Sequence, residues 1–105
     1  MDKKRSYREV KSFVEKVKRA VRPDVVILFG SRASGETWQQ SDYDFIIVSP
    51  VFEGMHWLER ISLLIKLWNL PKDIDILPYT PAEFEAKKKT SSFIRSALKK
   101  SVRLI

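Results

Sequence analysis

Two aspartates separated by one residue are the first feature of the sequence that suggests chemistry. Asp42 and Asp44 flank Tyr43 at the start of an apolar run over residues 43–48. Side chains at positions i and i+2 of a strand point to the same face, so the two carboxylates are predicted to project together. Neighbouring carboxylates repel one another unless a cation lies between them. Divalent metals with oxygen ligands are the usual cation, and Mg²⁺ typically bridges to phosphates, so the pair predicts a metal site.

A Gly-Ser pair lies upstream of the aspartates. Gly30 and Ser31 come just past the end of a predicted strand over residues 24–29. Their backbone N–H groups can bind a phosphate in that position. Arg32 follows and could contact a triphosphate, although an ordinary surface arginine is the alternative interpretation. The stretch over residues 30–48 therefore combines a phosphate-binding turn with a metal-binding pair.

A second phosphate motif must be weighed against this one. Gly30 and Gly35 have the spacing of the glycines in the phosphate-binding loop of P-loop ATPases. That loop needs a lysine directly after the second glycine, and Glu36 stands there instead. A carboxylate would repel the phosphates that the loop should hold, so we reject this alternative.

The Gly-Ser pair and the aspartate pair together resemble the signature of the nucleotidyltransferase superfamily typified by DNA polymerase beta. In that signature an apolar residue, Gly and Ser are followed, after a spacer, by Asp-x-Asp inside an apolar strand. Here Phe29-Gly30-Ser31 is followed by the spacer 32–41 and then by Asp42-Tyr43-Asp44. The chain length and the GSRASG motif are most similar to the minimal nucleotidyltransferases (MNT), small prokaryotic proteins often paired with a HEPN-domain partner. The resemblance implies one domain over residues 1–105, with an α/β (α+β) fold in which a small mixed β-sheet is flanked by helices.

The resemblance also implies a third carboxylate of apolar-Asp-apolar form. Asp75 matches it, because it lies between isoleucines in an apolar run over residues 74–77 that we expect to be a buried strand. A buried aspartate is costly without a counter-ion or hydrogen bonds. Asp73 is the competing candidate, because it would point to the same face of the strand as Asp75. We expect it just before the start of that strand. The implied catalytic and metal-binding residues are Asp42, Asp44 and Asp75, and the implied nucleotide-binding residues are Gly30, Ser31 and Arg32.

The activity that the resemblance implies is Mg²⁺-dependent transfer of AMP from ATP to an acceptor hydroxyl, with two Mg²⁺ ions at the site. A domain of this length has little surface left to enclose an acceptor, so another macromolecule is expected to bring it. The resemblance implies that this is a HEPN-domain toxin, modified on a tyrosine, with this chain as the antitoxin. One departure is Ser34, which stands where antitoxin-type members often carry a second arginine. The efficiency and the base preference of this chain are therefore open.

Two other functions remain alternatives. The domain could neutralise a HEPN partner by contact alone, or it could bind nucleic acid and transfer nucleotides to RNA. The net charge of +7 favours phosphate-rich or acidic partners without choosing between them. The intact Gly-Ser pair and the three carboxylates favour the enzyme, because contact alone needs none of them. A homo-oligomer is also open, since Trp38 and Trp57 could serve a dimer as well as a partner interface.

Composition narrows the remaining classes. The chain has no cysteine, which excludes disulfides, thiol nucleophiles and zinc-thiolate sites. His56 is the sole histidine, which excludes a multi-histidine metal site. No apolar run is long enough to span a membrane, and no signal peptide is read at the N-terminus, so we expect a cytoplasmic protein without a membrane partner.

Periodicity predicts the elements that must position the site. Helices are expected over residues 6–21, 55–68 and 92–100, and Thr80 with Pro81 should open another. The first helix would start with a capping box of Ser6 and Glu9. The helix over 55–68 should have Arg60 beside its buried stripe, which is predicted to consist of Leu58, Ile61, Leu64, Ile65 and Trp68.

Strands are expected over residues 24–29, 43–48, 74–77 and 102–105, the last at a sheet edge. A short connection must bring the end of the first strand to the start of the second. That is easiest if the two strands run antiparallel.

Overall fold

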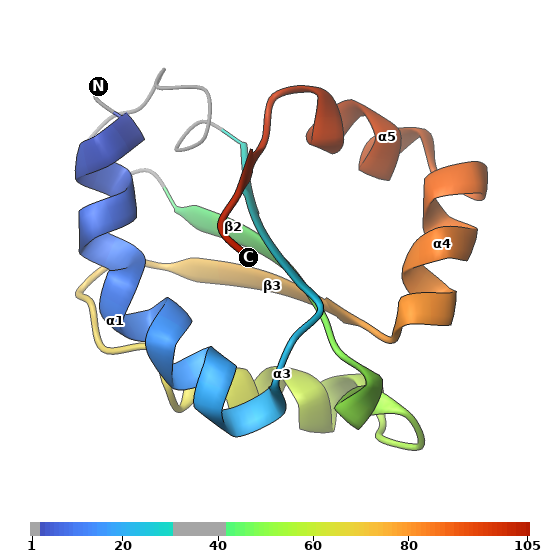
Figure 1. Cartoon of the computed structure of the whole chain (residues 1–105), viewed down its shortest axis with the longest axis horizontal. Coiled ribbons are helices and arrows are strands. Elements are labelled where there is room, and N and C mark those ends of the chain that lie inside the picture. Colours follow the sequence, from blue (N-terminus) through green and yellow to red (C-terminus); the bar gives the residue numbers. More distant parts are fainter. Residues whose placement is uncertain (1–2, 31–41) are drawn as a thin grey trace.

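The computed structural model describes residues 3–30 and 42–105, which form one four-stranded sheet with helices on both faces (Figure 1). The strand order is β3-β2-β1-β4. Strands β1 (Val25–Phe29) and β2 (Tyr43–Val48) pair antiparallel, as predicted. Strand β3 (Ile74–Tyr79) runs parallel to β2, and β4 (Val102–Arg103) is antiparallel to β1 at the other edge. The prediction of a small mixed sheet flanked by helices is confirmed.

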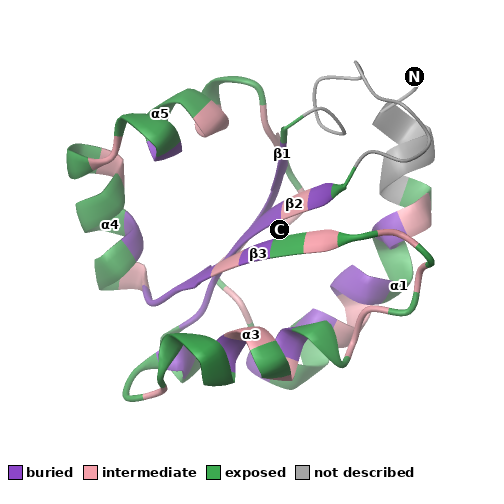
Figure 2. Ribbon diagram, turned by 180° about the vertical axis from the view of Figure 1, so that it is seen from behind, coloured by how far each residue is buried: buried purple, intermediate pink, exposed green. Residues whose placement is uncertain are grey.

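Alternating residues of the central strands supply two hydrophobic cores, because successive side chains of a strand point to opposite faces. Phe45 and Ile47 of β2 face the core under α1 (Lys3–Val21) and α3 (Trp57–Ile65). Ile46 and Val48 face the core under α4 (Pro81–Thr90) and α5 (Ser92–Lys99). Figure 2 shows how buried residues run along the strands while the helices alternate between buried and exposed positions.

Local signals near the end of the chain predicted its structure well. Thr80 is the N-cap of α4, and its side chain and that of Glu83 form a reciprocal capping box. Ser91 caps α5, whose residue Ile94 is buried against the sheet. Among the described residues, no helix has the length and hydropathy that a membrane crossing requires.

The predicted capping box at the start of α1 was wrong. The helix already begins at Lys3, so Ser6 lies inside it and Glu9 is an interior residue. The Glu9 carboxylate instead accepts hydrogen bonds from the Tyr43 hydroxyl and, at 2.9 Å, from Lys72 Nζ. Glu9 therefore links α1 to the start of β2 and to the loop before β3.

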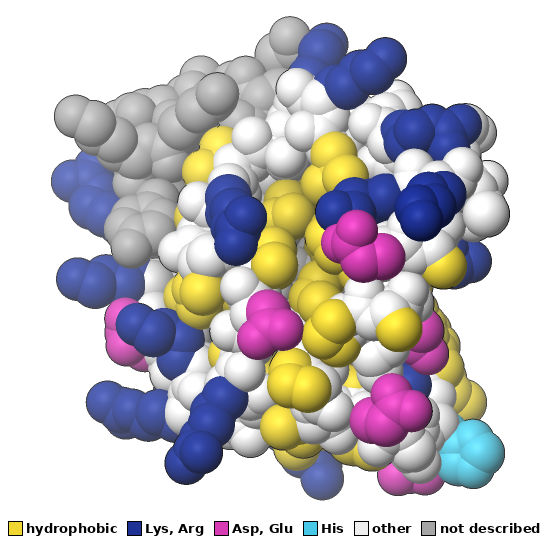
Figure 3. All heavy atoms as spheres, turned by 45° about the vertical axis from the view of Figure 1, so that its right-hand side comes forward, with side chains coloured by type: hydrophobic (Ala, Val, Ile, Leu, Met, Phe, Trp, Pro, Cys, Tyr) yellow, Lys and Arg dark blue, Asp and Glu magenta, His cyan; other side chains and the backbone are white. Residues whose placement is uncertain are grey.

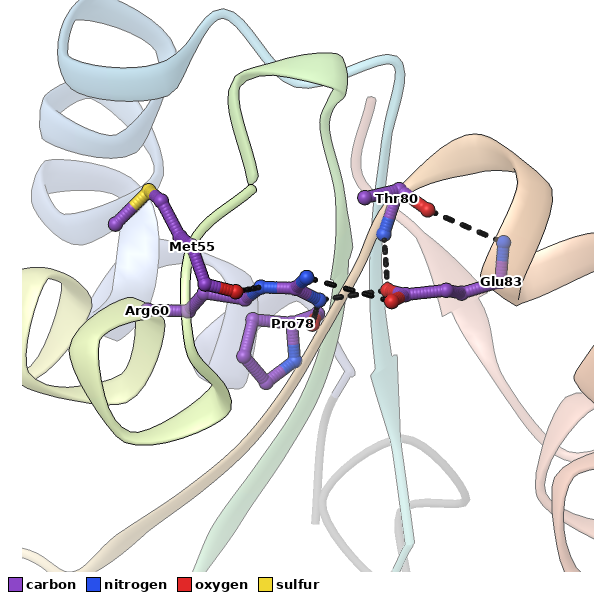
Figure 4. Close-up of polar contacts among 5 residues, drawn as sticks. All are labelled: Met55, Arg60, Pro78, Thr80 and Glu83. Carbon is purple, nitrogen blue, oxygen red and sulfur yellow. Dashed lines mark hydrogen bonds and ion pairs between the residues drawn. The ribbon is translucent and has the colours of Figure 1, made fainter. Parts of the chain in front are cut away.

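The predicted buried stripe over residues 55–68 was only partly right, since Trp68 does pack against the core under α1. Leu64 is buried as expected, but Leu58 is 74% exposed and Ile65 is 45% exposed, whereas Arg60 is only 6% exposed. The helix is oriented so that the Arg60 side chain points inward. Its guanidinium group donates hydrogen bonds to the Glu83 carboxylate across the end of β3 (Figure 4). The shorter helix begins at Trp57 and follows the 3-10 turn η1 (Pro50–Phe52).

Candidate active site

The strand register places Asp44 next to Asp75. Phe29 of β1 is directly opposite Asp44 of β2, and Asp44 is directly beside Asp75 of β3. The three residues therefore form one row across the sheet, on the face that α4 and α5 cover farther along the strands. Two carboxylates thus meet near the ends of neighbouring strands, beyond the buried core.

The surroundings of Asp44 disfavour its charged form. Burial raises the pKa of Asp44, and the negative charges of Asp75 and then Asp42 raise it further, as does a hydrogen bond to the Asp75 side chain. Together these effects bring the pKa of Asp44 to about 6. A partly buried pair of like charges is stabilised by a bound cation, because the cation replaces the repulsion with attraction.

Gly30 lies directly against this carboxylate. Its φ of +76° is in the left-handed region that favours glycine. A Cβ atom placed on Gly30 would lie 2.5 Å from Asp44 Oδ2, closer than real Cβ contacts allow. Both the backbone conformation and the space beside Asp44 therefore require a residue without a side chain. The turn after β1 and the carboxylate of β2 form one tightly packed unit.

A cavity of about 870 Å³ opens beside the pair. Its walls are mostly apolar, with a hydroxyl side chain from Ser96 of α5 and a basic side chain from Lys100, which directly follows this helix. Figure 3 shows hydrophobic side chains gathered on one face of the molecule, with lysine and arginine side chains around them. The residues that line the cavity are Phe29, Gly30, Asp44, Ile61, Ile65, Ile74, Asp75, Ile76, Leu77, Phe93, Ser96, Ala97 and Lys100.

The other residues singled out in the sequence are placed as follows. Asp42 is exposed one residue before β2 and acts on Asp44 through its charge. Asp73 is exposed before β3, and its backbone oxygen accepts a hydrogen bond of 3.0 Å from Tyr43 N. Ser31, Arg32 and Trp38 lie outside the described residues. Within residues 8–30 and 42–105, no three His, Asp or Glu side chains gather closely enough to hold a metal ion together.

The expectation that Asp75 is buried was wrong. Strand β3 lies at the edge of the sheet, so Asp75 is exposed while its neighbour Ile76 is buried. An edge position also explains Pro78, which has no N–H to donate to a further strand. Asp75 therefore reaches solvent and the cavity at once, without the cost of a buried charge.

Sequence reasoning missed the cavity wall on α5. Phe93 and Ile94 are adjacent, and adjacent residues of a helix cannot share a face. Ile94 is buried against the sheet, so Phe93 is left at the cavity with 62% of its surface exposed. The pair of adjacent apolar residues was the available signal, but only the docking of α5 decides which one turns inward.

Comparison with known proteins identifies the family. The sequence profile of the nucleotidyltransferase domain matches residues 10–104. The chain belongs to the nucleotidyltransferase domain family. No match to a curated protein is found.

Solved structures show the same fold. A candidate nucleotidyltransferase from Sulfolobus solfataricus has a TM-score of 0.64 at 22% identity, covering 96% of this chain and 80% of its own. A second crystal structure described as a candidate nucleotidyltransferase has a TM-score of 0.62 at 27% identity, covering 92% and 98%. A toxin-antitoxin structure with AMP-PNP has a TM-score of 0.65 at 17% identity, covering 90% and 71%.

The donor set of this nucleotidyltransferase domain fits a hard divalent metal. Such domains generally use a nucleoside triphosphate and a divalent metal. Asp44 and Asp75 supply carboxylate oxygens side by side, which is the ligand chemistry of Mg²⁺. The absence of a side chain at Gly30 leaves the backbone close to the same carboxylate, where a phosphate bound to the metal would need room.

Proposed function

We propose that this nucleotidyltransferase domain transfers AMP from ATP to a tyrosine of a HEPN-domain partner and serves as the antitoxin of that pair. The observation that carries the proposal is the contact between Asp44 and Asp75 in an apolar cavity, with Gly30 packed against Asp44. A like-charge pair that no cation of the described residues neutralises is poorly suited to a purely structural role. Similarity to the toxin-antitoxin structure with AMP-PNP supports both the adenine nucleotide and the protein partner.

Asp44 and Asp75 would hold Mg²⁺, with Asp42 adding negative charge beside them. When bound, Mg²⁺ neutralises the charge of the triphosphate and of the leaving pyrophosphate. The backbone of Gly30, and Ser31 after it, would bind the phosphates, and Arg32 would add positive charge.

The reaction is a displacement at the α-phosphorus. The acceptor hydroxyl oxygen forms a bond to the α-phosphorus while the bond to the β-phosphate oxygen breaks, and pyrophosphate leaves. Asp75 is exposed in the cavity, so one of its Oδ atoms can accept the hydroxyl proton.

The proposed acceptor is a side chain of the partner protein. The cavity lies at the edge strand β3, where an incoming side chain can reach Asp75. The net charge of +7 favours an acidic surface on the partner. A protein partner can therefore present its hydroxyl to a site that this domain leaves open.

Calorimetric titration with Mg-ATP tests the site. We expect wild type to bind, and Asp44→Asn and Asp75→Asn each to lose binding by about tenfold or more, because each removes charge from the metal site. Asp73→Asn is the matched control, since Asp73 is an exposed aspartate two residues from Asp75 but outside the pair. Equal losses in all three variants would mean that general surface charge, and not the pair, binds Mg-ATP.

Label transfer tests the acceptor. With α-labelled ATP and a co-expressed HEPN-domain partner, label should appear on the partner and disappear when the acceptor tyrosine is changed to phenylalanine. Neutralisation of the partner without any label, and undiminished in Asp44→Asn, would instead establish binding by contact alone. Label on RNA would establish the RNA-directed alternative.

A further inference from the structure

Phe93 is a large apolar side chain that the fold leaves exposed beside the carboxylate pair. It lines the cavity from α5, and 62% of its surface is exposed. Leaving this much of a phenylalanine in water forgoes burial that the core would otherwise gain. Exposed apolar residues that gather at the wall of a cavity commonly mark a ligand site.

The ring of Phe93 is held in place from the sheet. It meets Phe29 edge to face, with ring centroids 6.2 Å apart and an interplanar angle of 84°. Phe29 is itself buried and lies directly opposite Asp44 in the register. The aromatic wall and the carboxylate pair are therefore neighbours in the same cavity and on the same row of the sheet.

A second apolar wall comes from α3. Ile61 and Ile65 line the cavity from this helix, because Arg60 and Leu64 take the inward positions. Figures 1 and 2 show α3 and α5 at opposite sides of the strands. Phe93 and the two isoleucines therefore line one cavity from opposite faces of the sheet, across the edge strand β3.

We infer that Phe93, with Ile61 and Ile65, binds the purine ring of the nucleotide, and that this wall selects ring size and not base identity. The inference rests on the proposed function, since it needs a nucleotide anchored at Asp44 and Asp75. Stacking on an aromatic side chain accepts every base, because every base has a π-face. A purine offers more area than a pyrimidine and so binds more tightly.

The polar groups of the cavity point to the same selectivity. Among the described lining residues, Ser96 and Lys100 are the polar side chains outside the carboxylate pair. The Ser96 hydroxyl both donates and accepts, so it accommodates the edge of either adenine or guanine, and the Lys100 ammonium, which only donates, could pair with the N7 acceptor that both purines carry. ATP and GTP are therefore expected to bind within a few-fold of one another, and both more tightly than UTP.

Titration of Phe93→Ala with Mg-ATP, Mg-GTP, Mg-UTP and Mg-tripolyphosphate tests this inference. We expect about tenfold weaker binding of ATP and GTP, equal to about 1.4 kcal/mol. Tripolyphosphate has no ring, so its affinity should not change. Phe93→Trp should restore ATP binding. Leu58→Ala is the matched control, because Leu58 is also a largely exposed apolar residue but does not line the cavity.

The outcomes separate this inference from the function on which it rests. If wild type binds Mg-ATP and Phe93→Ala binds it equally well, the ring subsite is wrong while the nucleotide site stands. Equal weakening of ATP and tripolyphosphate would mean a general structural defect and would also overturn the subsite. A large preference for ATP over GTP would overturn selection by ring size. Failure of wild type to bind any of the four probes would overturn both the subsite and the proposed function.

Discussion

The two ends of β3 carry charged side chains in opposite arrangements. At its start, Asp75 lies beside Asp44, and burial with the charge of Asp75 raises the pKa of Asp44. At its far end, Arg60 Nη1 lies 2.6 Å from Glu83 Oε1, and this hydrogen bond lowers the pKa of Glu83. One strand thus joins a pair of like charges to a pair of opposite charges.

The far end is a satisfied network. The Arg60 guanidinium also donates to the backbone oxygens of Met55 and Pro78, each at 3.1 Å, and Glu83 Oε1 accepts from Thr80 N at 2.8 Å (Figure 4). These bonds connect α3, β3 and α4. We infer from this difference that the charged groups at the far end of β3 stabilise the fold, because the fold supplies their partners, whereas the like-charge pair at its start is suited to binding a cation from solution.

The largest expected effect comes from breaking the satisfied network. Arg60→Met should destabilise the domain by about 3 kcal/mol, because it leaves buried carbonyl groups without donors. Urea unfolding measures this change. Arg19→Met, at an exposed position of α1, is the control and should stay within about 0.5 kcal/mol of wild type. Similar small effects in both variants would show that the Arg60 network contributes little.

The next effect concerns the packing of Gly30 against Asp44. Gly30→Ala should cost about 2 kcal/mol, because it combines a positive φ with a Cβ too close to Asp44 Oδ2. Gly54→Ala is the matched control, since Gly54 has a φ of +80° but nothing within 4 Å of its Cβ position. It should cost only about 1 kcal/mol by thermal or urea unfolding.

A double-mutant cycle sharpens the same point. In an Asp44→Ala background the close contact is absent, so the cost of Gly30→Ala should fall to that of Gly54→Ala. An unchanged cost would mean that the backbone conformation alone accounts for the effect of Gly30→Ala.

At the like-charge pair we expect a smaller effect, and a gain of stability where the preceding substitutions cause a loss. The pKa of Asp44 lies above its unfolded value, so the folded state is favoured below about pH 4 and loses stability as the pH rises through about 6. With a chelator present to remove metal ions, Asp44→Asn should therefore raise the free energy of unfolding by about 1 kcal/mol at pH 8, after allowing for solvent screening. Near pH 3 it should cause no change. Melting temperatures across this range measure the difference, and a destabilised Asp44→Asn at pH 8 would contradict it.

The smallest effect concerns Glu83, whose side chain is 45% exposed. The pKa of Glu83 is lower in the folded state than in the unfolded state. The Glu83 carboxylate therefore stabilises the fold at pH values above its unfolded pKa, and this stabilisation is lost as the pH falls through its folded pKa. Glu83→Gln should cost less than about 1 kcal/mol at pH 7 and nothing in acid. Asp44→Asn and Glu83→Gln should thus change stability at neutral pH in opposite directions, and the same direction for both would break the comparison.

Local pattern determined much of this protein. A continuous apolar run predicted β2, Thr80 with Pro81 predicted the start of α4, and the Asp-x-Asp spacing predicted two carboxylates on one face of a strand. These features depend on residues close in sequence, so they can be read without a structure. The Gly-Ser pair before Asp-x-Asp was also enough to indicate the family to which the chain belongs.

Tertiary structure decided three features. The family resemblance favoured Asp75 over Asp73, but it is the parallel register of β3 with β2 that sets Asp75 beside Asp44. The position of Glu83 on α4 turns Arg60 inward on α3 and leaves Ile65 at the cavity. The docking of α5 buries Ile94 and exposes Phe93. In each case the choice lies between residues that are equivalent in local pattern, and only partners distant in sequence make one of them lower in free energy.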